Sequence, residues 1–260
     1  MTELDAVIAR ALRVPISSLA AGALQPVRVA VLDSGIDASH TDLRNRVESA
    51  VICSADEKGS VAITPSDPTA NNDTYGHGTA VASIIARIAP NATLIDVRVL
   101  GGNKPGSPDA FLGGIDFANS TDAQIMNMSV AVGESYLPRL IPLTEKAYRR
   151  GKIIVAATRN RPLEDEGYPA SIVACIGVGN AGRGREDIWR FRRDIIEFMG
   201  HGVDVPVAVA GGGYATQSGT SFATPIIAGL IALLLGAHSG LSPFDVKAIL
   251  KAFAANAASS

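Results

Sequence analysis

The sequence is poor in cysteine and histidine, and neither sign of charge is in marked excess. Its 260 residues include 2 Cys and 4 His, and 23 Lys and Arg stand against 25 Asp and Glu, for a formal net charge of −2. Two cysteines are too few for a disulfide framework. The balanced charge argues against an electrostatic nucleic-acid binder, which is usually strongly basic. A hydrophobic fraction of 47% excludes a disordered chain.

Long hydrophobic runs are also missing. The longest strongly apolar run, 226–237, is shorter than the roughly 20 residues that cross a bilayer, so we expect a buried helix and no membrane anchor. Charged residues interrupt the N-terminus, which therefore lacks the apolar stretch of a signal peptide. As written, the sequence predicts a cytoplasmic protein, and a secreted one if a leader or prosegment has been removed.

The sequence does contain apolar strands that alternate with segments of helical periodicity. Predicted strands lie within 26–35, 93–100, 123–130, 152–158 and 171–178, and predicted helices cover 77–87, 109–119 and 137–150, with two more beginning near 220 and at 242. This alternation is typical of an α/β protein whose mostly parallel central sheet has helices on both faces. In such sheets the functional loops gather at the carboxyl ends of the strands.

The N-terminal segment differs from the rest of the chain. Residues 2–12 have apolar side chains at helical spacing, and Thr2 and Asp5 are arranged as a capping box. We expect an N-terminal extension, residues 1–26, with a short docking helix, followed by a single domain over residues 27–260.

Three positions flanked by glycine carry candidate chemistry. Asp33 ends the first strand just before Gly35, and His77 lies between two glycines where a helix begins. Ser221 follows a glycine-led turn at the start of an apolar helix, where the helix dipole is positive. Taken alone, each has a plain structural explanation, such as a helix N-cap for Ser221. Together they supply the carboxylate, the base and the nucleophile of serine acyl transfer.

The segments around these residues resemble the subtilisin-like serine proteases, or subtilases. V-A-V-L-D-S-G-I-D, G-H-G-T-A-V-A and S-G-T-S-F-A-T-P are similar to the Asp, His and Ser motifs of that family, and the resemblance runs from about Val27 to Ala255. It implies a three-layer subtilisin-like fold and a serine endopeptidase. Ser221 would be the nucleophile, His77 the general base and acid, and Asp33 the orienting carboxylate, while Asn160 would complete the oxyanion hole.

The sequence departs from the family where the substrate should bind. Arg159 stands where subtilases usually have glycine before the oxyanion asparagine, and Ser129-Val130-Ala131 replaces Ser-Leu-Gly. We expect these four residues to bind substrate in a pocket that is narrower or differently charged. In 159–167 the acidic residues favour a basic substrate side chain, whereas the arginines disfavour one. The sequence therefore does not determine which substrate residue is preferred. A restricted protease acting on peptides or proteins is expected.

No cofactor is expected. The loop that builds a tight calcium site in extracellular subtilases is missing between the helix that begins at His77 and the I-A-P segment at 88–90. Asp42 matches a family calcium ligand, but we expect it to lack partners, and a weak calcium site stays open. The missing signal, prosegment and calcium loop together suggest an intracellular or precursor-processing protease.

Other interpretations of the chain compete with this one. A catalytically silent subtilase fold that binds peptides is the main alternative, and an esterase or amidase with the same nucleophile is another. The G-x-G-x-x-G match at 177–182 is weak on its own. The arginines around Trp189 indicate a surface loop or a contact surface for an acidic partner. We expect no nucleic-acid or membrane partner, and the sequence does not determine the oligomeric state.

Overall fold

The computed structural model describes residues 24–101, 106–160, 167–182, 189–190 and 197–256. The predicted docking helix at 2–12, the acidic residues at 164–166 and the arginine side chains around Trp189 lie outside the described residues. The helices are α3 (His77–Ile88), α4 (Pro108–Ser120), α5 (Leu137–Arg149), α6 (Thr220–Ala237) and α7 (Pro243–Phe253), with a 3-10 turn at Glu134–Tyr136. The strands are β1 (Val27–Asp33), β2 (Val47–Ala55), β3 (Val61–Ser66), β4 (Ala92–Arg98), β5 (Ile125–Met128), β6 (Ile153–Ala157), β7 (Cys175–Asn180), β8 (Trp189–Arg190), β9 (Phe198–Gly200), β10 (Val205–Ala208), β11 (Tyr214–Gln217) and β12 (Ala255–Asn256).

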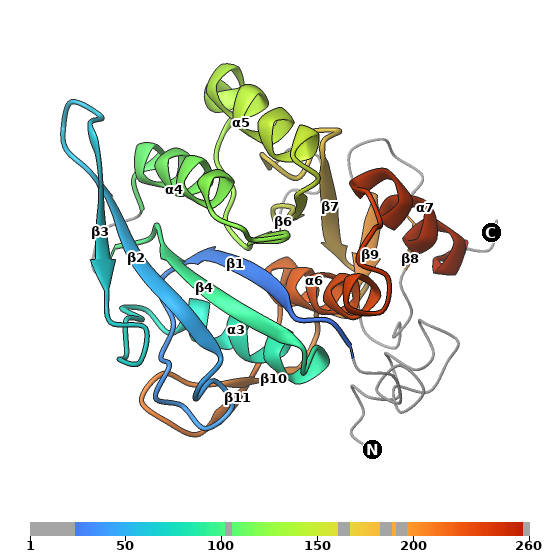
Figure 1. Ribbon diagram of the computed structural model, residues 1–260, viewed down its shortest axis with the longest axis horizontal. Helices are drawn as coiled ribbons and strands as arrows, with labels where there is room; N and C mark the ends of the chain where they lie inside the picture. The colour runs from blue at the N-terminus through green and yellow to red at the C-terminus, as the bar shows by residue number, and fades with distance from the viewer. Residues whose placement is uncertain (1–23, 102–105, 161–166, 183–188, 191–196, 257–260) are drawn as a thin grey trace.

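A mostly parallel sheet forms the centre of the molecule (Figure 1). Its strand order is β12-β8-β9-β7-β6-β5-β1-β4-β2-β3, and every neighbouring pair from β9 to β2 is parallel. β3 pairs antiparallel with β2 at one edge, and β10 and β11 form a separate antiparallel pair. The central strands β1, β5 and β6 are buried almost throughout, which is why their sequences are near-continuous apolar runs.

Helices cover both faces of this sheet, as predicted. One core cluster joins the sheet to α3 and α6 through Val29, Ile85 and Ile227, and a second joins it to α4 and α5 through Leu32, Phe111 and Leu140. Figure 1 shows the two pairs of helices on opposite sides of the strands. The predicted three-layer α/β architecture is therefore confirmed.

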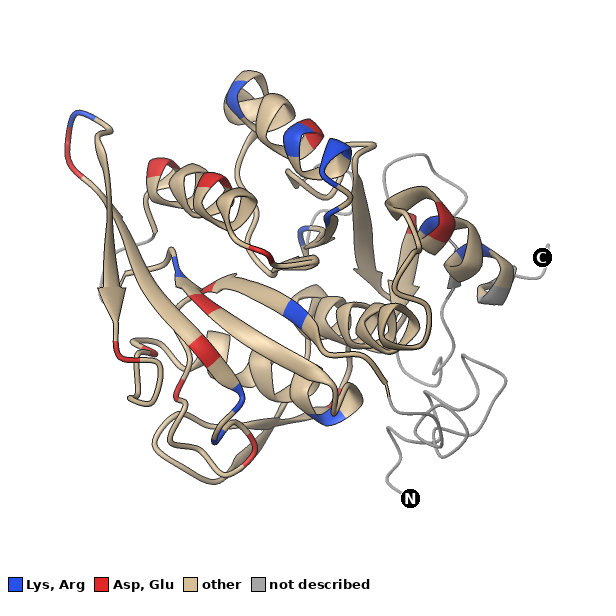
Figure 2. Ribbon diagram, viewed as in Figure 1, with Lys and Arg blue, Asp and Glu red and all other residues tan. Residues whose placement is uncertain are grey.

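Helix α6 is the apolar centre of one layer. It is long and apolar enough to cross a membrane by length and composition, with a mean hydropathy of 1.9, yet 89% of its length is buried inside the protein. Figure 2 shows no Lys, Arg, Asp or Glu along it. A helix that is hydrophobic all round fits the core of a large domain, so α6 is a core helix, as expected from the sequence.

Several predicted boundaries were wrong. The strand predicted over 123–130 ends at Met128, so Ser129 and Val130 lie beyond it. The strand predicted over 171–178 begins at Cys175, because residues 169–174 turn back through a hydrogen bond from Ile172 N to Pro169 O. β2 and β3 were missed, since every side chain of β3 is exposed or partly exposed and shows no apolar alternation.

The contact between α3 and α6 depends on a glycine. A Cβ added to Gly229 would lie 2.8 Å from Ile88 Cβ, closer than side chains pack. We expect Gly229→Ala to lower the free energy of unfolding by about 1–2 kcal/mol, because overpacking outweighs the better helix propensity of alanine. Gly240→Ala, whose Cβ would meet nothing within 4 Å, is the control and should change it by less than about 0.5 kcal/mol. Urea denaturation midpoints measure both, and equal values would contradict the prediction.

Candidate active site

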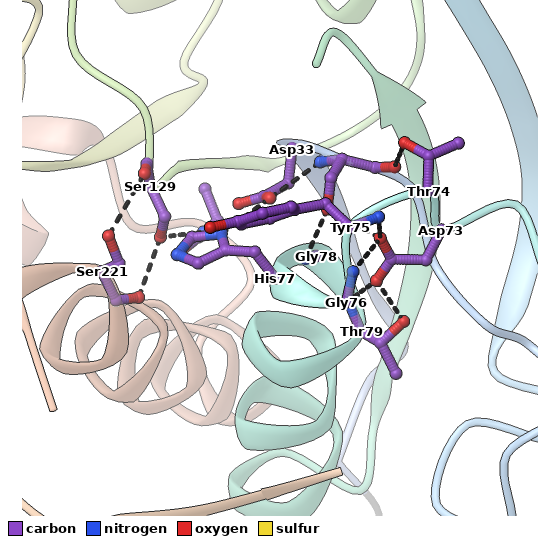
Figure 3. Close-up of polar contacts among 12 residues, drawn as sticks. Asp33, Asp73, Thr74, Tyr75, Gly76, His77, Gly78, Thr79, Ser129 and Ser221 are labelled. Atoms are coloured by element: carbon purple, nitrogen blue, oxygen red, sulfur yellow. Dashed lines mark hydrogen bonds and ion pairs between the residues drawn. The ribbon is translucent and has the colours of Figure 1, made fainter. Parts of the chain in front are cut away.

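The site begins with a buried carboxylate in contact with a histidine. Asp33 is the last residue of β1 and is fully buried, and His77 is the first residue of α3, with 20% of its side chain exposed. Asp33 Oδ1 lies 2.8 Å from His77 Nδ1 and also accepts a hydrogen bond from Ser34 N at 2.7 Å (Figure 3). A carboxylate at this nitrogen fixes the tautomer that carries its proton on Nδ1 and leaves Nε2 free to accept a proton.

Glycines allow the two segments to approach this closely. A Cβ on Gly78 would lie 2.1 Å from Gly35 O, and Gly35 itself has a φ of 105°, in the left-handed region that favours glycine. The glycines that the sequence marked around Asp33 and His77 therefore have a physical role: they let the start of α3 lie against the turn after β1.

Ser221 is the second residue of α6 and lies at the same edge of the sheet. Its Oγ donates to Ser129 O at 3.3 Å, and the Ser129 hydroxyl donates back to Ser221 O at 3.0 Å. Figure 3 shows His77, Ser129 and Ser221 gathered at one place. Because Ser221 Oγ donates to Ser129 O, transfer of its proton to His77 requires the hydroxyl to exchange this bond for one to the imidazole.

Asn160 lies in the segment that follows β6, beside the start of α6. Its Oδ1 accepts hydrogen bonds from Thr220 N at 2.9 Å and Thr220 Oγ1 at 3.2 Å. These two donors identify the oxygen of the amide, so Nδ2 faces away from them. The side chain is exposed and lies beside the first turn of α6, whose leading amides have no acceptor within the helix.

A cavity of about 480 Å³ adjoins Ser221 and Asn160. Ser129, Ala131 and Arg159 line it, and Ala131 and Arg159 also line a neighbouring cavity of about 680 Å³ that includes Val130. The stem of Arg159 lies against Gly167, where an added Cβ would be 3.0 Å from Arg159 Cγ. The structure therefore brings all four predicted substrate-binding residues to the walls of two adjoining cavities.

Carboxylates dominate the electrostatics of His77. Burial lowers the pKa of His77, but the charge and hydrogen bond of Asp33, together with the charge of Asp73, raise it above its ordinary value. On its other side the ring contacts Phe222, with the two ring centroids 5.5 Å apart. His77 is therefore flanked by carboxylates, which favour its charged form, and by the apolar ring of Phe222.

Two acidic residues near the site were missed by the sequence analysis. Asp96 lies on β4 beside β1, and its Oδ2 accepts a hydrogen bond from Ile36 N at 3.1 Å, in the loop that follows Asp33. Asp73 precedes α3 and accepts hydrogen bonds from Gly76 N and Thr79 N. An acidic residue shortly before a helix is typical of a cap, so the sequence could have pointed to Asp73. By contrast, nothing in the apolar strand around Asp96 marks that residue.

The remaining predicted polar residues have structural partners. Buried His40 bonds through Nε2 to Gly213 O at 3.0 Å and contacts the Tyr214 ring edge-on. Asp42, the residue compared with a calcium ligand, accepts a hydrogen bond from Tyr214 Oη at 2.7 Å. Within the residues that the structure describes, no group of three or more His, Cys, Asp or Glu side chains could hold a metal ion. The absence of a cofactor stays a prediction.

The stability of the fold should depend on pH through Asp96. Burial raises the pKa of Asp96 to about 7, whereas an unfolded aspartate titrates near 3.9. The folded state therefore binds more protons between these values, and the stability that Asp96 contributes falls as pH rises from about 4 to 7. Asp96→Asn removes the charge, so the variant should gain stability over the wild type between pH 5 and pH 8, by at most about 4 kcal/mol.

Thermal unfolding of both proteins at pH 5 and pH 8 measures this gain. Exposed Asp116, which pairs with Lys146, provides the matched control Asp116→Asn, whose effect on stability should be nearly the same at both pH values. A stability difference for Asp96→Asn that does not grow with pH would show that the carboxyl group is ionised in the folded protein throughout.

The chain is similar to one known protein family and to individual proteins. The family model described as "Subtilase family" (Peptidase_S8) matches residues 25–260. The chain is 33% identical over 227 residues to "Subtilisin NAT" of Bacillus subtilis subsp. natto, covering 82% of this chain and 56% of that protein. It is 34% identical over 224 residues to "Intracellular serine protease" of Paenibacillus polymyxa, covering 80% of this chain and 66% of that one.

A solved structure is also similar. The "cold adapted subtilisin-like serine proteinase" superposes with a TM-score of 0.68 at 25% identity, covering 86% of this chain and 80% of that one. The chain spans little more than half the length of "Subtilisin NAT". Since the family model matches nearly the whole chain and curated relatives exceed 30% identity, the chain belongs to the subtilase family.

Proposed function

We propose that the protein is a serine endopeptidase of restricted specificity, whose catalytic domain comprises residues 27–260. The 2.8 Å contact between Asp33 Oδ1 and His77 Nδ1, at the same sheet edge as Ser221, is the observation that supports it most directly. Two of the proteins named above are called a serine protease and a serine proteinase, which fits this activity.

In the proposed reaction His77 first accepts a proton from Ser221 and then donates it to the leaving group. Its Nε2 takes the proton of Ser221 as Oγ attacks the carbonyl carbon of the peptide, and a C–O bond forms. His77 then gives that proton to the departing amine as the C–N bond breaks, which leaves an acyl-enzyme. Water attacks the acyl group by the same route and restores Ser221. Throughout, the Asp33 carboxylate accepts the Nδ1–H bond and stabilises the imidazolium.

The negative charge on the carbonyl oxygen needs donors that are already in place. Asn160 Nδ2 and the backbone N–H of Ser221 are the proposed pair, because Thr220 fixes the Asn160 oxygen on the opposite side. Ser221 also stands in the first turn of α6, where the positive end of the helix dipole favours negative charge. These donors cost no reorganisation when the oxyanion develops.

Arg159 and Ala131 support a restricted substrate range. Both line the cavity beside Ser221, so a bound peptide side chain meets a methyl group and a guanidinium stem where most subtilases have glycines. We further propose that peptides or proteins are the substrates and that activity needs no tightly bound calcium. Precursor processing in the cytoplasm fits the relative named an intracellular serine protease.

One observation favours a second candidate, a silent peptide-binding subtilase fold. The Ser221 hydroxyl donates to the backbone oxygen of Ser129. A hydroxyl held in this bond does not give its proton to His77, as expected of a protein without activity. The buried Asp33 argues against this alternative, because a fully buried carboxylate paired with histidine serves a protein that stabilises an imidazolium.

The experiment that tests the proposal incubates the purified protein with a diverse peptide library, with and without a chelator. Ser221→Ala is the blank. We expect cleavage that depends on Ser221, persists with the chelator and has a narrow residue preference. Small esters and a fluorophosphonate probe run in parallel. Cleavage of esters alone would favour an esterase, and a folded protein that neither cleaves nor reacts with the probe would favour the silent module.

Asn160 offers a sharper test of the oxyanion site. Asn160→Ala should lower kcat by about 10²–10³ with a small change in KM, the loss known for the corresponding donor in subtilisin. Partly buried Asn91, whose amide donates to Gln25 O and Ala232 O, serves as the control through Asn91→Ala. Steady-state kinetics on the best library peptide measure both. A decrease confined to KM would show that Asn160 binds the ground state only.

A further inference from the structure

Asp73 is the most heavily bonded carboxylate near the site. Its Oδ1 accepts hydrogen bonds from Ser34 Oγ at 2.8 Å, Tyr75 N at 3.0 Å and Gly76 N at 2.7 Å. Its Oδ2 accepts from Thr79 N at 2.8 Å and from Thr79 Oγ1. Figure 3 shows these bonds converging on Asp73 from the residues on both sides of His77. A carboxylate satisfied by this many donors is held firmly in one orientation.

These bonds connect the two residues of the buried pair. Ser34, whose Oγ donates to Asp73, also donates its backbone N–H to Asp33 Oδ1 at 2.7 Å. The same Ser34 Oγ accepts a hydrogen bond from Gly78 N at 2.9 Å. Asp73 is therefore connected to Asp33 through Ser34. It bonds directly to the backbone before His77, at Gly76, and through Ser34 to the backbone after it, at Gly78.

Thr79 extends the network to the loop after β1. Its hydroxyl donates to Asp73 Oδ2 and accepts a hydrogen bond from Asp37 N at 2.9 Å, and its side chain is fully buried. The loop after β1 and the first turn of α3 are thus fastened to one carboxylate, in addition to the close contact between Gly35 and Gly78.

We propose that Asp73 is a positioning residue for catalysis, which fixes the His77 imidazole against Asp33 and whose charge stabilises the imidazolium formed during acyl transfer. The proposal rests on the serine endopeptidase function proposed above. Asp73 touches no reacting atom, and it acts through Ser34 and the backbone around His77.

The charge of Asp73 matters because of where His77 stands. His77 is the first residue of α3, where the positive end of the helix dipole disfavours a cation. The charged groups that act on it are Asp33 on β1 and Asp73 in the loop before α3. On β4, Asp96 lies within range of both carboxylates and of Arg98. From α6 the uncharged Phe222 ring contacts the imidazole. Loss of the Asp73 charge should therefore lower the pKa of His77.

The test compares Asp73→Asn with a matched variant of the same loop. An asparagine keeps one acceptor oxygen but turns a donor group towards either Thr79 or Ser34, so half of the network is lost. We expect kcat to fall by about tenfold to hundredfold with a smaller change in KM, as for a misplaced catalytic group. The acid limb of the kcat/KM profile should move to lower pH.

Asp67→Asn is the control. Asp67 also stabilises a turn, accepting hydrogen bonds from Thr69 N at 2.8 Å and Thr69 Oγ1 at 2.7 Å, but it has no bond to the segments of Asp33 or His77. It should keep the kcat and the acid limb of the wild type. Equal losses in the two variants would overturn the proposal, because they would show general loosening of the loop.

Ser34→Ala separates position from charge. It removes the link between Asp73 and Asp33 without changing any charge, so kcat should fall while the acid limb stays in place. If Asp73→Asn fails to fold, Ser34→Ala decides: an unchanged kcat overturns the positioning role.

A titration of His77 followed by NMR gives a readout that needs no activity. It is performed on the Ser221→Ala protein with and without Asp73→Asn, and the midpoint should move to lower pH only when Asp73 is replaced. An unmoved midpoint overturns the electrostatic role of Asp73. If the midpoint moves but the protein with intact Ser221 cleaves no peptide, the proposed protease function has failed while the electrostatic role of Asp73 stands.

Discussion

The hydrogen bond between Asp33 and His77 is the contact on which the site depends. It joins the end of β1 to the start of α3, two segments 44 residues apart, and it exists only because both backbones approach closely. Gly35 and Gly78 permit that approach, since a side chain on Gly78 would overlap the Gly35 carbonyl. Everything else at the site is arranged around a histidine whose tautomer this bond has fixed.

Hydrophobic burial supplies the rigidity that this arrangement needs. Helix α6 lies in the core and packs against both the sheet and α3. Its first turn is joined to the residue after β6 by the hydrogen bond from Thr220 Oγ1 to Thr158 O at 2.7 Å. Ser221 is therefore attached to a buried helix and not to a mobile loop, and Asn160 is oriented by the same Thr220. A site on rigid elements is held more accurately than one on loops.

Acidic residues gather near His77, and the burial of one of them lowers the stability of the fold as pH rises. Asp33, Asp73 and Asp96 lie near one another, and burial keeps Asp96 largely protonated at acidic pH, with a pKa of about 7. The charges of Asp33 and Asp73 raise the pKa of His77 and so favour the imidazolium, while a third charge in the same region would add repulsion and desolvation. The site therefore combines groups that support an imidazolium with one that is best left neutral.

Local sequence patterns predicted the layers, the sheet edge and the candidate residues Asp33, His77 and Ser221, because apolar periodicity and glycine-flanked motifs are local properties. Family resemblance supplied Asn160 and the four residues Ser129, Val130, Ala131 and Arg159, which the structure brings to adjoining cavities. The bond from Ser34 to Asp73, the burial of Asp96 and the contact of His40 with Gly213 emerged from the fold alone. They join segments distant in sequence, and such contacts leave no pattern in any one segment.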